Sequence, residues 1–254
     1  MPDLSPLDWT LLCVGVFCIG IAKTAIGGAG SIAVAAFALV LPARESTGAI
    51  LPLLIAGDLI AVAIYHHHTN WRLIRRLLPW VAVGVVGGAG FVAVIDDSVM
   101  RRVIGGVLLA LALLQLVTRG GRLAERLGDP GAGPRSAGQH VGGVLAGVAA
   151  GFVTMVANVA GTVTTIYLLL SGLAKMQFLG TTAWFFLLVN VFKLPFSIQL
   201  GLVQPAALQL DLVLLPLVGV GALAGVLLVR RMDQGQFEKA VLVLACLSAV
   251  PLLL

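Results

Sequence analysis

Hydrophobic residues occupy long runs along the whole chain, and short polar stretches separate the runs. A helix needs about 20 residues to cross the hydrocarbon core of a bilayer, at a rise of about 1.5 Å per residue. The last three runs of each half reach about this length, whereas the second run of each half has about 11 residues. The runs are Pro6 to Ala22, Ser31 to Leu41, Ser46 to Tyr65, Leu77 to Ile95, Val99 to Val117, Val141 to Ala157, Thr162 to Gly172, Phe178 to Leu200, Ala206 to Val229 and Phe237 to Leu254. The pattern predicts membrane-spanning helices and one shorter segment in each half.

The glycine and polar positions of the first half recur in the second half at a nearly constant spacing. The spacing between equivalent positions grows only from 131 to 137 residues along the chain. The equivalent pairs are Gly20 and Gly151, Lys23 and Thr154, Gly27 and Asn158, Gly30 and Gly161, Gly48 and Gly180, Asp58 and Asn190, Pro79 and Pro216, Gly88 and Gly225, and Asp96 and Asp233. The chain is therefore predicted to contain one unit twice, which is typical of secondary transporters.

Composition indicates which solvent surrounds these helices. Hydrophobic residues make up 59% of the 254 positions, and charged residues only 11%. A soluble domain of this length does not need so much apolar surface, so the sequence predicts an integral membrane protein with the lipid bilayer as a partner. The net charge of +5 is small, which argues against nucleic acid as a partner. A homodimer is left open.

Basic residues concentrate on one side of the predicted helices. When successive connections are assigned alternately to two sides, twelve basic residues fall on the odd connections and three on the even ones. The odd set is Lys23, Arg72, Arg75, Arg76, Arg119, Arg122, Arg126, Arg135, Lys175, Arg230, Arg231 and Lys239, the even set is Arg44, Arg101 and Arg102, and most acids (Asp3, Asp8, Glu45, Asp96, Asp97 and Asp211) are also even. Cytoplasmic connections carry the excess of lysine and arginine. The odd side, with the basic linker, is predicted to be cytoplasmic, and both termini are predicted to lie outside.

Five segments in each half is an odd number, so the second half is expected to enter the membrane in the opposite orientation. The expected organisation is a first membrane repeat at 1–118, a cytoplasmic linker at 119–140 and a second membrane repeat at 141–254. Non-helical backbone at membrane depth is tolerated only where protein or water surrounds it. We predict an all-α integral membrane protein with two inverted-topology repeats, each a broken or re-entrant helical hairpin plus three transmembrane helices. The alternative to a break in the membrane is that Gly27, Gly28 and Gly30 only allow close helix packing.

The two glycine-rich breaks have the chemistry of an anion site. A helix that starts at a break presents free N–H groups and its positive dipole end there. Ser31 and Thr162 are the predicted N-caps, and Lys23 adds a positive charge one turn before the first break. A cation would need several carboxylates or rings of carbonyl groups, which neither break supplies. The candidate substrate-binding residues are Lys23, Thr24, Gly27, Gly28, Ala29, Gly30, Ser31, Asn158, Val159, Ala160, Gly161, Thr162, Asn190 and Lys193.

Asp58 and Lys193 lie deep within predicted spans, where a charge needs a partner or a function. One interpretation is a structural ion pair between them that joins the two halves. The other is a role in transport, with Asp58 as a proton-coupling group.

The run His66 to His68 suggests an alternative function, a cation or metal-ion permease that also uses Asp58. Consecutive residues on a helix end point in different directions, so a collar at the membrane interface is the preferred interpretation. The sequence contains no zinc-protease, nucleophile-elbow or phosphate-loop signature. We therefore expect no enzyme activity, no metal site and no cofactor.

The stretch Gly20 to Gly30 reads Gly-Ile-Ala-Lys-Thr-Ala-Ile-Gly-Gly-Ala-Gly and resembles the N-terminal signature of the sulfite exporter TauE/SafE family. Asn190, Lys193 and Pro195 are similar to a polar triplet of that family, and the resemblance covers nearly the whole chain. It implies a multi-pass permease of the bacterial inner membrane for a sulfur-containing oxyanion such as sulfite, sulfoacetate or another organosulfonate. Ala29 stands where the family often has a further glycine, which leaves the particular anion open. Alternating access, with the anion between the two breaks, is the mechanism that a duplicated architecture suggests.

Overall fold

The computed structural model describes residues 4–25, 29–118, 137–159, 161, 164, 168, 171–233 and 235–237, which contain helices and no strand. The elements are α1 (Pro6–Thr24), α2 (Gly30–Val40), α3 (Ala43–Tyr65), the short 3-10 helix η2 (His66–His68), α4 (Trp71–Val94), α5 (Asp97–Thr118), α7 (Ala137–Ala157), α9 (Lys175–Gln199) and α10 (Pro205–Arg230). The prediction of an all-α membrane protein is confirmed.

Five of the described helices are long and apolar enough to cross a membrane, namely α1, α3 with η2, α4, α9 and α10. By contrast, α2 has 11 residues, or about 16 Å at 1.5 Å per residue, roughly half the hydrocarbon thickness. The short second segment of the first half is therefore confirmed. Its predicted counterpart at Thr162 to Gly172 and the last predicted run at Phe237 to Leu254 lie largely outside the described residues.

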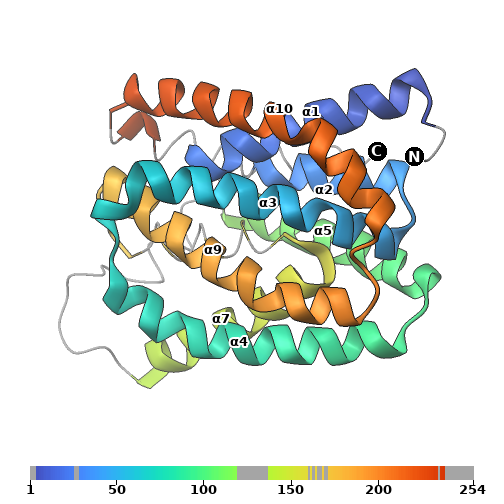
Figure 1. Cartoon of the computed structure of the whole chain (residues 1–254). Helices are drawn as coiled ribbons and strands as arrows, with labels where there is room; N and C mark the ends of the chain where they lie inside the picture. Colours follow the sequence, from blue (N-terminus) through green and yellow to red (C-terminus); the bar gives the residue numbers. More distant parts are fainter. Residues whose placement is uncertain are drawn as a thin grey trace.

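The helices form three layers, with α3 and α9 crossing between two outer pairs (Figure 1). One outer pair is α1 with α10, and the other is α4 with α7. By the spacing of the repeat, α1 is equivalent to α7, α3 to α9 and α4 to α10. Exchange of the two halves therefore turns one outer pair into the other and leaves the central pair unchanged. The duplicated unit is visible in the packing, whereas the inverted orientation of the two units stays a prediction.

Glycines at equivalent positions bring the outer pairs together. A Cβ atom added to Gly221 of α10 would overlap the carbonyl oxygen of Phe17 in α1, and one added to Gly84 of α4 would overlap that of Val148 in α7. Gly84 and Gly221 are equivalent positions, so the same contact occurs twice. Without a hydrophobic force between helices in lipid, small residues that allow close backbone approach supply much of the packing energy. Gly84 and Gly221 are thus packing residues, whereas Gly30 of the first break makes no such close backbone contact.

Two basic side chains donate hydrogen bonds to the terminal carbonyl groups of equivalent helices. The Arg44 guanidinium donates hydrogen bonds to the carbonyl oxygens of Val92 and Ile95, at 2.9 and 2.7 Å, where α4 ends. The Lys175 ammonium donates to the carbonyl oxygens of Val229 and Met232, at 3.2 and 2.6 Å, where α10 ends. A cation at a helix C-terminus satisfies free carbonyl groups and opposes the helix dipole. Both interactions therefore anchor the start of a central helix to the end of an outer one.

Replacement of Arg44 or Lys175 by methionine is expected to lower the free energy of unfolding by about 1 kcal/mol each. The methionine keeps the aliphatic contacts, but it leaves two terminal carbonyl groups without their charged donor. Thermal unfolding of the purified protein in detergent would measure the loss. Arg72→Met, on an exposed side chain at the start of α4, is the control and should cost nothing. An equal loss in all three variants would contradict the capping role.

The structure corrects several boundaries. The predicted connection that carried Arg72, Arg75 and Arg76 belongs to the first turns of α4, because α4 begins at Trp71. Asp211 lies within α10 and is 5% exposed, although the sequence pattern placed it in a connection. Capping by side chains and tertiary packing extend these helices beyond the apolar runs, as at Asn70, whose side chain accepts from the Leu73 N–H group.

Candidate functional site

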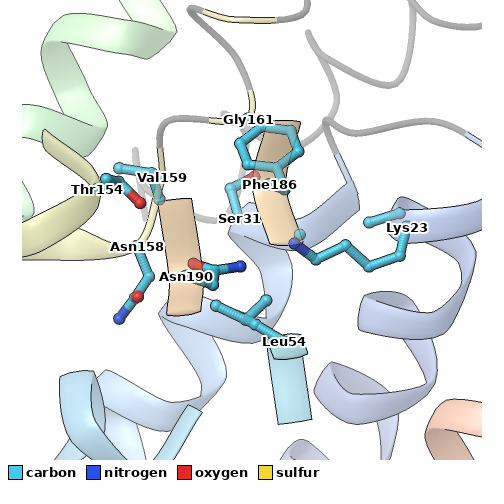
Figure 2. A pocket seen from close by; sticks show the side chains of 11 residues that line it. Lys23, Ser31, Leu54, Thr154, Asn158, Val159, Gly161, Phe186 and Asn190 are labelled. Atoms are coloured by element: carbon cyan, nitrogen blue, oxygen red, sulfur yellow. The ribbon is translucent and has the colours of Figure 1, made fainter. Parts of the chain in front are cut away.

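A cavity of about 40 Å³ lies where both halves meet, between α1, α2, α3, α7 and α9. A buried water needs about 10–15 Å³, so the cavity has room for a few waters or for one compact ion. Its lining is Ala22, Lys23, Gly30, Ser31, Leu54, Thr154, Asn158, Val159, Gly161, Phe186 and Asn190. In Figure 2 the Lys23 side chain reaches in from α1, and Thr154, Asn158 and Val159 lie on the opposite side. The lining is mostly apolar, with one ammonium group and a few hydroxyl and amide groups.

One end of the cavity carries an ion pair whose carboxylate is fully buried. The Lys23 ammonium lies 2.8 Å from Oδ1 of Asp58, and their side chains are 10% and 0% exposed. Nδ2 of Asn190 donates to the other Asp58 oxygen, Oδ2, at 2.6 Å. The Lys23 ammonium also lies 4.7 Å from the centroid of the Phe186 ring, within the range of a cation–π interaction. Asp58 thus has a partner at each oxygen, an ion pair at Oδ1 and a hydrogen bond at Oδ2, and Lys23 lines the cavity.

The second buried lysine, Lys193, lies behind the opposite wall and is 1% exposed. Its ammonium donates to the carbonyl oxygen of Thr154 at 3.1 Å, to the Thr154 hydroxyl oxygen at 3.3 Å and to Oδ1 of Asn158. All of these acceptors are neutral, and together they match the three donors of an ammonium group. The interpretation of Asp58 and Lys193 as one ion pair is therefore wrong. Asp58 pairs with Lys23, which the spacing along the chain could not show.

Asn158 holds the end of α7 in a conformation that few residues adopt. Its φ is 55°, in the left-handed region where asparagine is the most tolerated residue after glycine. Its Nδ2 group donates to the carbonyl oxygen of Thr47 at 2.9 Å, and its Oδ1 atom accepts from Lys193. The equivalent position in the first half is Gly27, which has the same conformational freedom. The Asn158 side chain thus connects the second break to both α3 and α9 by hydrogen bonds.

The first break places a helix start beside the cavity. Gly30 and Ser31 line the cavity and are the first two residues of α2. The first N–H groups of a helix have no partner within it, and no side chain caps α2. The predicted N-cap, Ser31, is wrong by two positions, because the helix begins earlier and Ala29 is its N-cap residue. The positive end of α2 therefore lies at the cavity, as the sequence pattern predicted.

The structure brings many of the predicted residues together, but not all of them. Lys23, Gly30, Ser31, Asn158, Val159, Gly161 and Asn190 line the cavity. Ala29 is buried beside it, whereas the Thr24 hydroxyl donates to the carbonyl oxygens of Gly20 and Ala222 and joins α1 to α10. Lys193 supports the wall without lining it. Gly27, Gly28, Ala160 and Thr162 lie outside the described residues.

The predicted set lacks four lining residues, Ala22, Leu54, Thr154 and Phe186. Leu54 and Phe186 are the two large apolar ones. Each lies one helical turn before a polar residue, Leu54 before Asp58 and Phe186 before Asn190, and residues four apart share a helix face. They are also equivalent to each other, with the same spacing of 132 residues as Asp58 and Asn190. The repeat spacing could therefore have identified Leu54 and Phe186, if it had been applied to apolar positions as well as to polar ones.

The histidine run forms η2 at the end of α3. The described residues contain no group of three or more His, Cys, Asp or Glu side chains that could hold a metal ion. Nδ1 of His66 lies 3.2 Å from the carbonyl oxygens of Val62 and Ala63, and its ring stacks on that of His67. These contacts are local to the helix end, eight residues or about 12 Å along α3 from Asp58.

The long apolar helices define a multi-pass membrane protein, and charged and amide groups gather at a cavity between its two halves. The family model described as Sulfite exporter TauE/SafE matches residues 12–252, and the chain therefore belongs to this family. The family consists of membrane permeases for sulfur-containing anions and not of enzymes, so this protein is a membrane transporter of that class. No curated protein and no solved structure matches the chain.

Proposed function

We propose that the protein moves a small sulfur oxyanion, such as sulfite, sulfoacetate or another organosulfonate, through the cavity between the two halves. The observation that carries the proposal is the Lys23 ammonium in a buried cavity beside the start of α2. A cation and a helix N-terminus at one point favour an anion. The neutral amide of Asn190 and the residues at the end of α7 would complete the set of groups that contact the anion.

The apolar side chains in the lining favour an anion that has lost its hydration shell. Leu54 and Phe186 leave little room for water around the guest, so each polar contact counts for more than it would in water. The anion would exchange its hydration shell for N–H groups of the backbone and for the Lys23 ammonium. Selectivity against cations follows, because a cation would meet a positive charge and a helix N-terminus.

Transport would proceed by alternating access around this fixed site. The outer pairs, α1 with α10 and α4 with α7, each join helices from both halves, so each pair is a candidate rigid body. Rocking of these bodies against the central helices would open the cavity to one side and then to the other. We place the protein in a bacterial inner membrane, with the basic linker in the cytoplasm and both termini outside.

Gly30→Leu is expected to reduce anion transport at least tenfold with little loss of stability. A Cβ atom at Gly30 meets only the Ala22 side chain, at 3.7 Å, so the larger side chain fits the helix start but fills the cavity. Uptake of radiolabelled sulfite and sulfoacetate into proteoliposomes would measure transport. Gly90→Leu, where an added Cβ meets nothing within 4 Å, is the matched control on the exposed face of α4. Full transport by Gly30→Leu would refute this cavity as the site.

A further inference from the structure

We infer that the buried charges at the cavity select the charge of the substrate: a singly charged oxyanion binds alone, and a doubly charged one binds only together with a proton on Asp58. The inference rests on the proposed function and concerns the same cavity. It follows from a count of the buried charges and from the position of the Asp58 carboxylate.

The described charged side chains around the cavity are two lysines and one aspartate. Lys23 and Asp58 are in contact at 2.8 Å and cancel each other. Lys193 donates only to the neutral oxygens of Thr154 and Asn158, so its charge has no counter-ion among the described residues. With both lysines protonated and Asp58 ionised, the cluster carries one net positive charge when no guest is bound.

A buried net charge is costly, and an ion of opposite charge relieves the cost. One negative charge in the cavity brings the cluster to zero. A second negative charge would leave the cluster at minus one, with the anion and the Asp58 carboxylate competing for the Lys23 ammonium. When like charges share a site, protonation of one of them is favoured.

Asp58 is the group that the geometry offers for this proton. Its Oδ1 atom faces Lys23, and Lys23 lines the cavity. Lys23 from α1 and Lys193 from α9 are the described charged groups that act on Asp58, and Asn190 of α9 is its neutral donor. The other described helices that pack on α3 bring no further charged side chain to it. When a dianion binds, the Lys23 ammonium would donate its hydrogen bond to the dianion and no longer to Oδ1 of Asp58. Oδ1 would then take a proton from the aqueous solution on the open side and release it to the solution on the other side together with the anion.

Proteoliposomes with a trapped pH-sensitive dye test the inference on the unaltered protein. Methanesulfonate supplies one negative charge, and sulfoacetate at neutral pH supplies two. We expect methanesulfonate to enter without a change of luminal pH and sulfoacetate to enter with about one proton per anion. Proton movement with methanesulfonate, or sulfoacetate entry without protons, would overturn the inference while the proposed function stands. Failure to transport either of these anions or sulfite would overturn both.

Two single variants change the net charge of the cluster by one unit each, and a double variant restores it. Asn190→Asp removes the net positive charge and should slow methanesulfonate entry roughly tenfold or more. Asp58→Asn raises the net charge to two and should allow sulfoacetate to enter without a proton. The double variant Asp58→Asn/Asn190→Asp moves the carboxylate to the equivalent position and keeps the count, so it should still transport methanesulfonate.

The double variant also serves as the folding control, because it keeps the number of buried charges constant. Unchanged methanesulfonate entry in Asn190→Asp, or proton movement with sulfoacetate in Asp58→Asn, would each refute the charge count. If Asp58→Asn does not fold, the dye measurement on the unaltered protein still decides the question.

Discussion

Lys23→Met is expected to lower the free energy of unfolding by about 3–5 kcal/mol, because removal of one partner of a buried ion pair leaves the other charge without its contact partner. Asp58 is 0% exposed, so bulk water does not solvate its carboxylate in place of the lost ammonium. Asn190 would remain as its donor, but one amide hydrogen bond does not offset a buried carboxylate. Thermal or denaturant unfolding in detergent micelles would measure the change.

The double variant Lys23→Met/Asp58→Asn separates stability from transport. It removes both charges and keeps a polar group beside Asn190, so most of the lost stability should return. Transport should be lost in both the single and the double variant, because neither has the ammonium that faces the cavity. A double variant as unstable as Lys23→Met would show that the ion pair is not the cause. Normal transport by the double variant would remove Lys23 from the site.

Gly221→Ala is expected to destabilise the protein by about 1–3 kcal/mol, the usual cost of overpacking. The added methyl group would overlap the carbonyl oxygen of Phe17, and backbone cannot move aside as a side chain can. Gly219, two residues away in α10, has nothing within 4 Å of an added Cβ. Gly219→Ala should therefore be neutral, or stabilise by up to about 1 kcal/mol through helix propensity.

The other half of the molecule offers an independent repetition of this test. In α4, Gly84→Ala would overlap the carbonyl oxygen of Val148, whereas Gly87→Ala meets open space. If α1 with α10 and α4 with α7 are equivalent contacts, the two costly variants should lose similar stability. A large loss at Gly221 together with none at Gly84 would contradict the equivalence of the two outer pairs.

The sequence predicted the polar side of the site better than its apolar side. Lys23 was predicted because it adds a positive charge one turn before the first break, and Asn190 because it is equivalent to Asp58 in the repeat and belongs to the polar triplet; such polar residues inside apolar runs are visible in a single sequence. Leu54 and Phe186 were not selected, since leucine and phenylalanine within a span look the same whether they face lipid or a cavity. Lys193 was predicted to be a substrate-binding residue, whereas it lies behind the cavity wall and donates to Thr154 of α7 and to Asn158 just after it, partners that only the tertiary structure shows.

By itself, the sequence determined that this chain is an all-helical membrane protein, and it predicted two related units. Both conclusions follow from features that act locally, namely the length and apolarity of each run and the recurrence of glycines at a fixed spacing. Only the tertiary structure decided which buried charge pairs with which, because Lys23 lies 35 residues from Asp58 along the chain and Lys193 lies 135 residues from it. The crossing of α3 and α9 brings Asp58 to its equivalent residue Asn190. Ion pairing depends on distances of a few ångströms, and helix packing sets those distances.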